Sequence, residues 1–257
     1  MKIIKVEVFR LPTANSRQNS PIGCRVYTDA GIYGDGEAGM AYGVGGSAAF
    51  GMVCDLAELV IGMDPLGTEL IWETMYKKTF WGQNGGPVVF SGIAAIDVAL
   101  WDIKGKYFNA PVHELMGGSC RNKMRVYSWI GGDRPTDVGA AAREKMEAGF
   151  TAVKMNATEE LQFIDSYDKI DAVLERVDAI RLSCGKDFGI AIDFHGRVHR
   201  PMAKILAKKL EAYDPMFIEE PVLCENMECF REIAAACQIP IATGERLYSK
   251  WDFKRLF

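Results

Sequence analysis

Long apolar segments are missing from this sequence. The 257-residue chain has no run of about 18 apolar residues, the length that indicates a helix spanning a membrane. Residues 1–13 alternate between apolar and polar side chains, whereas a secretory signal peptide contains a continuous apolar stretch. We therefore expect neither a membrane span nor a membrane partner.

An excess of charge of either sign is missing too. Lys and Arg together number 30 and Asp and Glu 34, which gives a formal net charge of −4 and an isoelectric point near 5.5. Domains that bind nucleic acids usually carry a clustered excess of basic residues. The composition therefore argues against nucleic acid and favours a small molecule as the partner.

Paired cysteines are also absent. The seven cysteines are an odd number and lie scattered without a C-x-x-C pair, which predicts reduced thiols and a cytoplasmic location. Cys224 and Cys229 come nearest to a pair, and we expect no metal there. The glycine-rich segment 43–51 lacks the GxGxxG spacing of a dinucleotide site. The sequence therefore gives no indication of disulfide bonds, a zinc site or a dinucleotide-binding site.

The chain does contain regular hydrophobic patterns, and the pattern changes near residue 122. Within residues 3–39 three segments alternate apolar and polar residues, which predicts a β-meander. The polar stretch 13–20, between the first two strands, is expected to be mobile. Residues 47–108 show apolar spacings of three and four, which predict three helices. Length alone permits one domain or two, and this pattern indicates an α+β domain over residues 1–122.

Residues 123–257 alternate five short apolar runs with amphipathic helices. Such alternation is typical of parallel strands joined by helical crossovers. The longest of the expected helices covers residues 162–185. The predicted fold class is therefore α/β, with the α+β domain followed by five strand-helix units over residues 123–257.

Polar residues gather where the second to fifth of these strands end. They are, in chain order, Lys154 and Asn156, Asp193 and His195, Glu219 and Glu220, and Glu245 and Arg246. Ligands bind at the carboxyl ends of strands in parallel α/β sheets and barrels. Alternation along an extended strand would turn Asp193 and His195 toward the same side. These strand ends therefore form the candidate site.

Three of these carboxylates lie on successive strands at equal spacing, since Asp193, Glu219 and Glu245 are each 26 residues apart. Converging carboxylates repel one another unless a cation holds them together, and an all-oxygen set suits Mg²⁺. Taken singly, Glu219 and Glu220 could form a solvated turn, and Glu245 could cap a helix. Their common position at the strand ends favours a metal site.

Several motifs together resemble one known family. The segments are VKMN (153–156), IDFHGR (192–197), FIEEP (217–221), ATGER (242–246), AIDVALWDIKGK (95–106) and HELMGG (113–118). In this order they resemble the mandelate racemase subgroup of the enolase superfamily, and within it the sugar-acid dehydratases of the galactonate type. The resemblance implies an α+β capping domain over a modified TIM barrel.

The resemblance also implies a chemistry. It assigns Mg²⁺ to Asp193, Glu219 and Glu245, and it makes Glu220 a neighbour of the ligands or of the substrate. Asn156 and Arg246 would contact a sugar acid. Enzymes of this superfamily remove a proton next to a carboxylate, and the metal stabilises the resulting ene-diolate. His195 would donate the proton with which the β-hydroxyl leaves as water.

Two departures narrow this expectation. Racemases of the subgroup carry Lys-x-Lys after the second barrel strand, whereas this chain has Lys154 and Asn156 there. Asn cannot act as a base, so we expect dehydration and not racemisation. Lys154 would polarise the substrate carboxylate, although a structural lysine is an alternative.

The second departure is the extent of the chain. Family barrels continue through three more strands, one of which carries a His general base, so we expect that base beyond Phe257. The chain is then a part of a longer protein or a fragment with a defective site. The predicted function is the Mg²⁺-dependent dehydration of an aldonate such as galactonate to a 2-keto-3-deoxy acid. Alternatives are another acid-sugar dehydratase or cycloisomerase, or an inactive metal-binding fragment, and we expect a homo-oligomer.

Overall fold

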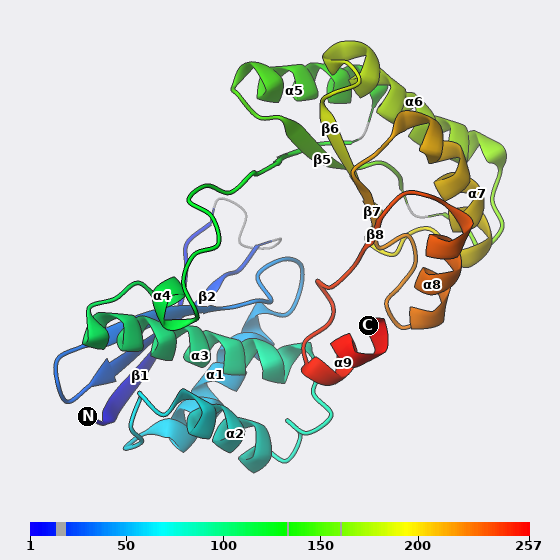
Figure 1. The fold of residues 1–257 in the computed structure, drawn as a ribbon. Coiled ribbons are helices and arrows are strands. Elements are labelled where there is room, and N and C mark those ends of the chain that lie inside the picture. Colours follow the sequence, from blue (N-terminus) through cyan, green and yellow to red (C-terminus); the bar gives the residue numbers. More distant parts are fainter. Residues whose placement is uncertain (14–18, 133, 160) are drawn as a thin grey trace. The chain divides into compact units, whose positions relative to one another are not determined.

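The chain folds into two compact units, which are described separately (Figure 1). The computed structural model describes residues 1–13, 19–132, 134–159 and 161–257. The first unit comprises Met1–Asn122 with Tyr248–Lys250, and the second comprises Lys123–Leu247 with Trp251–Phe257. Most of the stretch predicted to be mobile, residues 13–20, lies outside the described residues.

The first unit begins with the predicted meander. Its antiparallel sheet has the order β1 (Ile3–Arg10), β2 (Ile22–Thr28) and β3 (Tyr33–Ala38). Apolar side chains on one face of β2 are fully buried, which is what strict alternation along a half-covered strand produces. The short connection to β3 turns at Gly31, whose φ of 75° suits glycine.

Helices cover this sheet. They are α1 (Gly46–Val60), α2 (Thr68–Lys78), α3 (Pro87–Phe108) and the short α4 (Val112–Leu115). Helix α3 lies very close to β3. A Cβ atom added to Gly34 or Gly36 would stand 2.0 Å from a carbonyl oxygen of α3. Two glycines in one strand therefore allow the backbones of helix and sheet to touch.

The second unit contains the predicted alternation of strands and helices. Its parallel sheet has the order β4 (Ser128–Ile130), β5 (Ala152–Asn156), β6 (Gly189–Asp193), β7 (Phe217–Glu219) and β8 (Ile241–Ala242). The helices that follow are α5 (Pro135–Glu147), α6 (Tyr167–Cys184), α7 (Arg200–Leu210), α8 (Met227–Ala236) and α9 (Lys250–Leu256). A short 3₁₀ turn, η1 (Glu211–Tyr213), follows α7. The α/β class is confirmed, with consecutive parallel strands as in a partial barrel.

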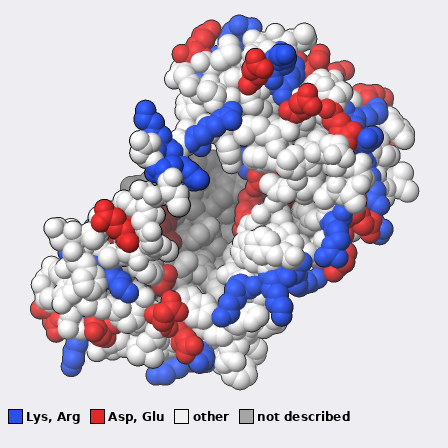
Figure 2. Space-filling model, viewed as in Figure 1, with Lys and Arg blue, Asp and Glu red and all other residues white. Residues whose placement is uncertain are grey.

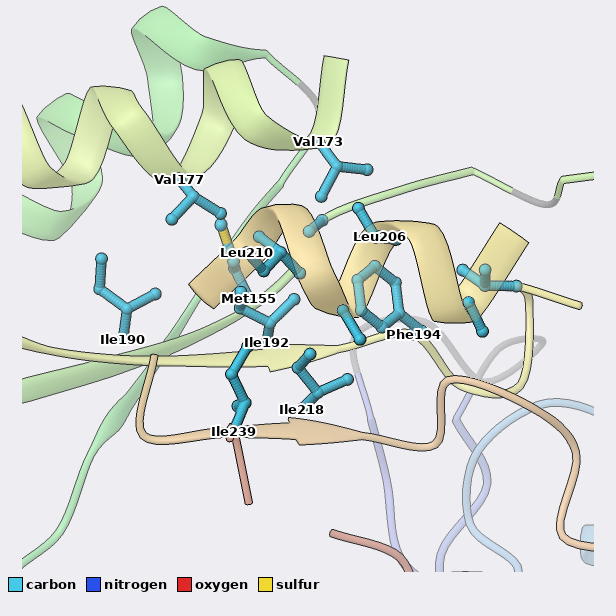
Figure 3. Close-up of a cluster of buried hydrophobic side chains, with 14 of the residues drawn as sticks. Met155, Val173, Val177, Ile190, Ile192, Phe194, Leu206, Leu210, Ile218 and Ile239 are labelled. Carbon is cyan, nitrogen blue, oxygen red and sulfur yellow. The ribbon is translucent and has the colours of Figure 1, made fainter. Parts of the chain in front are cut away.

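The core of this unit lies between the sheet and the helices (Figure 3). Ile192 of β6 and Ile218 of β7 face Leu206 and Leu210 of α7, and all four are at most 1% exposed. Strands buried on both faces read as continuous apolar runs, which is why β6 is almost wholly apolar up to Asp193. The apolar part of the strand anchors it, and the polar chemistry begins where the strand ends.

One predicted helix is shorter than its sequence pattern suggested. Helix α6 begins at Tyr167, not near residue 162. The carboxylate of Asp165 accepts hydrogen bonds from the backbone N–H groups of Gln162 and Ser166, at 2.9 and 2.8 Å. A side chain that captures backbone donors in this way competes with helix formation, so the first turn of the predicted helix is replaced by a polar turn.

No helix among the described residues is both long and apolar enough to cross a bilayer. Acidic and basic side chains are intermixed on the visible face of each unit (Figure 2).

Candidate active site

The candidate site lies at the carboxyl ends of β5, β6 and β7. The parallel register pairs Asn156 with Asp193, and Asp193 with Glu219. Neighbouring strands of a sheet are about 4.8 Å apart, so these three residues lie in one row across the sheet. The structure therefore brings together the polar ends of three successive strands, which lie side by side in Figure 1.

Lys154 joins two of these strand ends. Its Nζ lies 2.8 Å from Oδ2 of Asp193 and 2.5 Å from Oε2 of Glu219. The three side chains are 13%, 2% and 15% exposed, so the pairs are shielded from water. Burial alone would lower the pKa of Lys154, but the hydrogen bonds and charges of both carboxylates outweigh it and raise that pKa. The two carboxylates thus already converge on one cation.

His195 reaches this group by a different route from the one predicted. Strand β6 ends at Asp193, so alternation along a strand cannot orient His195, and the prediction was wrong in its reasoning. His195 lies in a turn with a φ of 48°, and its backbone N–H donates to Oδ1 of Asp193 at 2.9 Å. Nδ1 of the ring lies 2.7 Å from Oδ1 of Asn156 and 3.4 Å from Oδ1 of Asp193. A left-handed turn, not an extended strand, places the imidazole beside the carboxylate.

The turn that carries His195 is bound to β7. The backbone N–H of Phe194 donates to the carbonyl of Glu219 at 3.0 Å, and that of Gly196 donates to the carbonyl of Glu220 at 2.7 Å. Within the turn, the N–H of Arg197 donates to the carbonyl of Phe194 at 2.9 Å. The backbone around the imidazole is therefore held by the neighbouring strand end.

Glu220 and Arg246 form a second, buried pair. The side chain of Glu220 is fully buried and accepts a hydrogen bond from Nη1 of Arg246. Thr243 also donates to Glu220, with 3.4 Å between the two oxygens. Burial raises the pKa of Glu220 to about 7, while the charge of Arg246 acts in the opposite direction. This glutamate therefore fixes the guanidinium of Arg246, which is 36% exposed.

Glu245, the third predicted metal ligand, is more exposed than the other two. Its side chain is 42% exposed and lies 3.2 Å from the same guanidinium of Arg246. Within the described residues, no three His, Cys, Asp or Glu side chains are grouped so that they could hold a metal ion. The three-carboxylate site stays a prediction. Asp193 and Glu219 fit it, because they are oxygen donors that share one cation in this structure.

One aromatic residue of this group was missed by the sequence reasoning. Trp129 lies on β4, and its ring centroid is 6.0 Å from Nζ of Lys154 and 6.3 Å from the ring of His195. Strand β4 consists of Ser-Trp-Ile and ends in an apolar residue, so its end offered no polar residue to single out. The only available signal was its position as the strand preceding the Lys154 strand.

The two units match two adjoining domains of one family. Residues 5–117 match the mandelate racemase / muconate lactonizing enzyme N-terminal domain, and residues 137–257 match the enolase C-terminal domain-like family. A D-galactonate dehydratase from Cronobacter sakazakii (strain ATCC BAA-894) is 47% identical over 259 aligned residues. The alignment covers 100% of this chain and 64% of that relative, so the chain spans less than two thirds of its length.

Solved structures agree with this assignment. A member of the enolase superfamily from Salmonella Typhimurium has a TM-score of 0.90 and 33% identity, covering 99% of this chain and 70% of that one. An enolase from Pantoea ananatis with bound D-gluconate and Mg has a TM-score of 0.85 and 26% identity, covering 99% and 68%. The expectation drawn from the motifs is confirmed: the chain belongs to the enolase superfamily, in its mandelate racemase and muconate lactonizing enzyme group.

Proposed function

We propose that this chain carries part of the active site of a Mg²⁺-dependent sugar-acid dehydratase, which converts an aldonate such as galactonate to a 2-keto-3-deoxy acid. The observation that carries the proposal is the cluster of Lys154, Asp193, Glu219 and His195 at adjoining strand ends. The 47% identity to a D-galactonate dehydratase supports the substrate class. The enzyme would be a hydro-lyase.

We assign Mg²⁺ to the carboxylates of Asp193, Glu219 and Glu245. Asp193 and Glu219 already share a cation, and Glu245 would exchange Arg246 for the metal. When bound, Mg²⁺ supplies positive charge that stabilises the negative charge developing on the substrate carboxylate as the α-proton is lost. The enolase from Pantoea ananatis with bound D-gluconate and Mg supports this assignment.

The other residues bind and protonate the substrate. The ammonium of Lys154 would move from Asp193 and Glu219 to the substrate carboxylate. His195 would donate the proton from Nε2 to the β-hydroxyl, so that the carbon–oxygen bond breaks and water leaves. The amide N–H of Asn156 and the guanidinium of Arg246 would donate to substrate hydroxyls, with Glu220 acting through Arg246. None of these residues is proposed as the base that removes the α-proton.

The proposal extends to the location and the assembly of the enzyme. All seven cysteines are free thiols, which supports a reducing compartment, and we propose the cytoplasm. We also propose a symmetric homo-oligomer, because most soluble oligomers are homo-oligomers with closed symmetry.

The deciding experiment is incubation of the enzyme that contains both this chain and the expected general base with a panel of aldonates and aldarates, with and without Mg²⁺. We expect 2-keto-3-deoxy acid from galactonate only with Mg²⁺. In D₂O, His195→Asn should still exchange the substrate α-proton while forming no product, since only proton donation to the leaving group is lost. His199→Asn, in the loop before α7, is the matched control and should retain turnover.

The outcomes separate the alternatives. Loss of both exchange and product in His195→Asn would mean that His195 acts as a base or binds substrate. A lactone product without a 2-keto-3-deoxy acid would identify a cycloisomerase. Absence of turnover on the whole panel would contradict the dehydratase assignment.

A further inference from the structure

We propose that Asn156 is the positioning residue of His195: its side-chain oxygen holds a proton on Nδ1, so that the imidazole presents Nε2 for proton transfer. The role of Nε2 as the proton donor to the leaving hydroxyl rests on the proposed function. The hydrogen bond itself rests only on the described geometry.

Two oxygen atoms face the same ring nitrogen. Nδ1 of His195 lies 2.7 Å from Oδ1 of Asn156 and 3.4 Å from Oδ1 of Asp193. An ionised carboxylate can only accept hydrogen bonds. If Nδ1 carried a lone pair, that lone pair would point toward a negative oxygen of Asp193, whose side chain is only 2% exposed. A proton on Nδ1 satisfies the amide oxygen and reduces the repulsion.

The alternative orientation of the amide fits less well. A flipped Asn156 could donate an N–H to a bare Nδ1, since amide oxygen and nitrogen are assigned from their hydrogen bonds. That orientation would leave the Nδ1 lone pair 3.4 Å from the carboxylate of Asp193. The position of Asp193 therefore selects the amide oxygen as the partner of the ring.

The backbone that carries the amide is itself held in place. Asn156 is the last residue of β5 and is paired in register with Asp193. The backbone at Gly132 packs against the carbonyl of Asn156 so closely that a Cβ on Gly132 would stand 1.6 Å from the oxygen. The ring of Trp129 also lies near the imidazole, at 6.3 Å between centroids. The ring orientation is thus determined from several elements.

A fixed Nδ1–H has a chemical consequence. Imidazolium carries protons on both nitrogens, and after proton donation from Nε2 the proton on Nδ1 remains. The hydrogen bond to Asn156 is therefore compatible with both protonation states, and the ring need not turn during the cycle. Free histidine in water favours the opposite neutral tautomer, with the proton on Nε2, so the proposal predicts an inverted tautomer at this position.

The test is a long-range ¹H–¹⁵N correlation spectrum of protein labelled in histidine. The chain has three histidines, and substitution of His113 and His199 to Gln assigns the three patterns. At about pH 9, above the ordinary histidine pKa of about 6.5, the neutral tautomers are read directly. We expect the Nδ1–H pattern for His195.

Variants of the amide complete the test. Asn156→Leu removes the acceptor with little change in volume and should shift His195 toward the Nε2–H tautomer. Asn156→Asp keeps an oxygen acceptor and should retain the Nδ1–H tautomer. Asn122→Leu, at an exposed loop position, is the matched control and should change nothing. In turnover assays Asn156→Leu should lower kcat by about 10²-fold, because a catalytic group displaced by about 1 Å loses that much.

The outcomes are distinct from those of the proposed function. An Nε2–H pattern for His195 in the unsubstituted protein would overturn the proposal whatever the activity. An Nδ1–H pattern that survives in Asn156→Leu would overturn it as well and leave Asp193 as the sole partner. If the tautomer behaves as expected but no aldonate is dehydrated, the proposed function fails while the positioning by Asn156 stands.

Discussion

Replacing Lys154 by Met tests the buried cation directly. The substitution keeps a long unbranched side chain but leaves Asp193 and Glu219 facing each other without their shared ammonium. Breaking a buried ion pair by removing one partner costs about 3–5 kcal/mol, because the remaining charge is left uncompensated. The exposures of 13%, 2% and 15% place this cluster in that class and not among surface pairs, which contribute about 0–1 kcal/mol.

The assay is thermal unfolding in a metal-free buffer containing a chelator. At roughly 2–4 °C per kcal/mol, the melting temperature of Lys154→Met should fall by about 6–20 °C. Lys169→Met is the matched control, since Lys169 is 47% exposed and lies 3.7 Å from the exposed Glu159. Its melting temperature should change by no more than about 4 °C, as expected for an exposed pair.

Addition of Mg²⁺ should raise the melting temperatures of these proteins by different amounts. In the unsubstituted protein Mg²⁺ must displace the ammonium from two carboxylates, whereas in Lys154→Met no cation competes with it. We therefore expect a larger Mg²⁺-induced rise in melting temperature for Lys154→Met, and a smaller one for Glu219→Gln. A metal-free Lys154→Met within about 1 kcal/mol of the unsubstituted protein would refute the buried cluster. Equal Mg²⁺ responses in all three proteins would refute the metal assignment.

Two further predictions concern the segment directly after β4 and a carboxylate of α3. Gly132→Ala should destabilise the protein to urea by about 1–3 kcal/mol, because its Cβ would meet the carbonyl of Asn156, whereas Gly131→Ala enters open space and should be nearly neutral. Burial, and then the charge of Glu69, raise the pKa of Asp97 above its ordinary value of 3.8. The folded protein therefore favours the protonated side chain, and the stability that this side chain contributes is present below pH 3.8 and is lost as the pH rises through the higher folded pKa. Asp97→Asn should therefore raise the free energy of unfolding by about 0.5–1 kcal/mol at pH 7 and leave it unchanged near pH 3, as measured by urea titration at both pH values; equal effects at both would contradict this origin.

The elements of the second unit could be predicted because their hydrophobic periods are long and regular. The same argument located the candidate site, since parallel strands bring their carboxyl ends to one edge whatever the loops between them do. The argument from hydrophobic periods failed where the local backbone departs from a regular helix or strand. Asp165 captures backbone donors and shortens α6, and the positive φ of His195 ends the alternation that its neighbours follow.

Contacts between side chains lay beyond the sequence pattern. Spacing alone could not tell that Lys154 would lie between Asp193 and Glu219, nor that Glu220 would pair with Arg246, because each depends on side-chain direction. Trp129 gave no signal at all, since an apolar residue on a core strand is ordinary.

The backbone bonds from the His195 turn to β7 have a consequence for local stability. The amides of Phe194 and Gly196 are protected by the carbonyls of Glu219 and Glu220, and the N–H of Glu220 is in turn bonded to the carbonyl of Ala242 on β8. Segments linked in this way open as one cooperative unit. These three amides should therefore exchange with deuterium at similar rates. Any fluctuation that breaks the hydrogen bonds at the carboxyl end of β7 would remove the imidazole and the Glu219 carboxylate from the site in the same event.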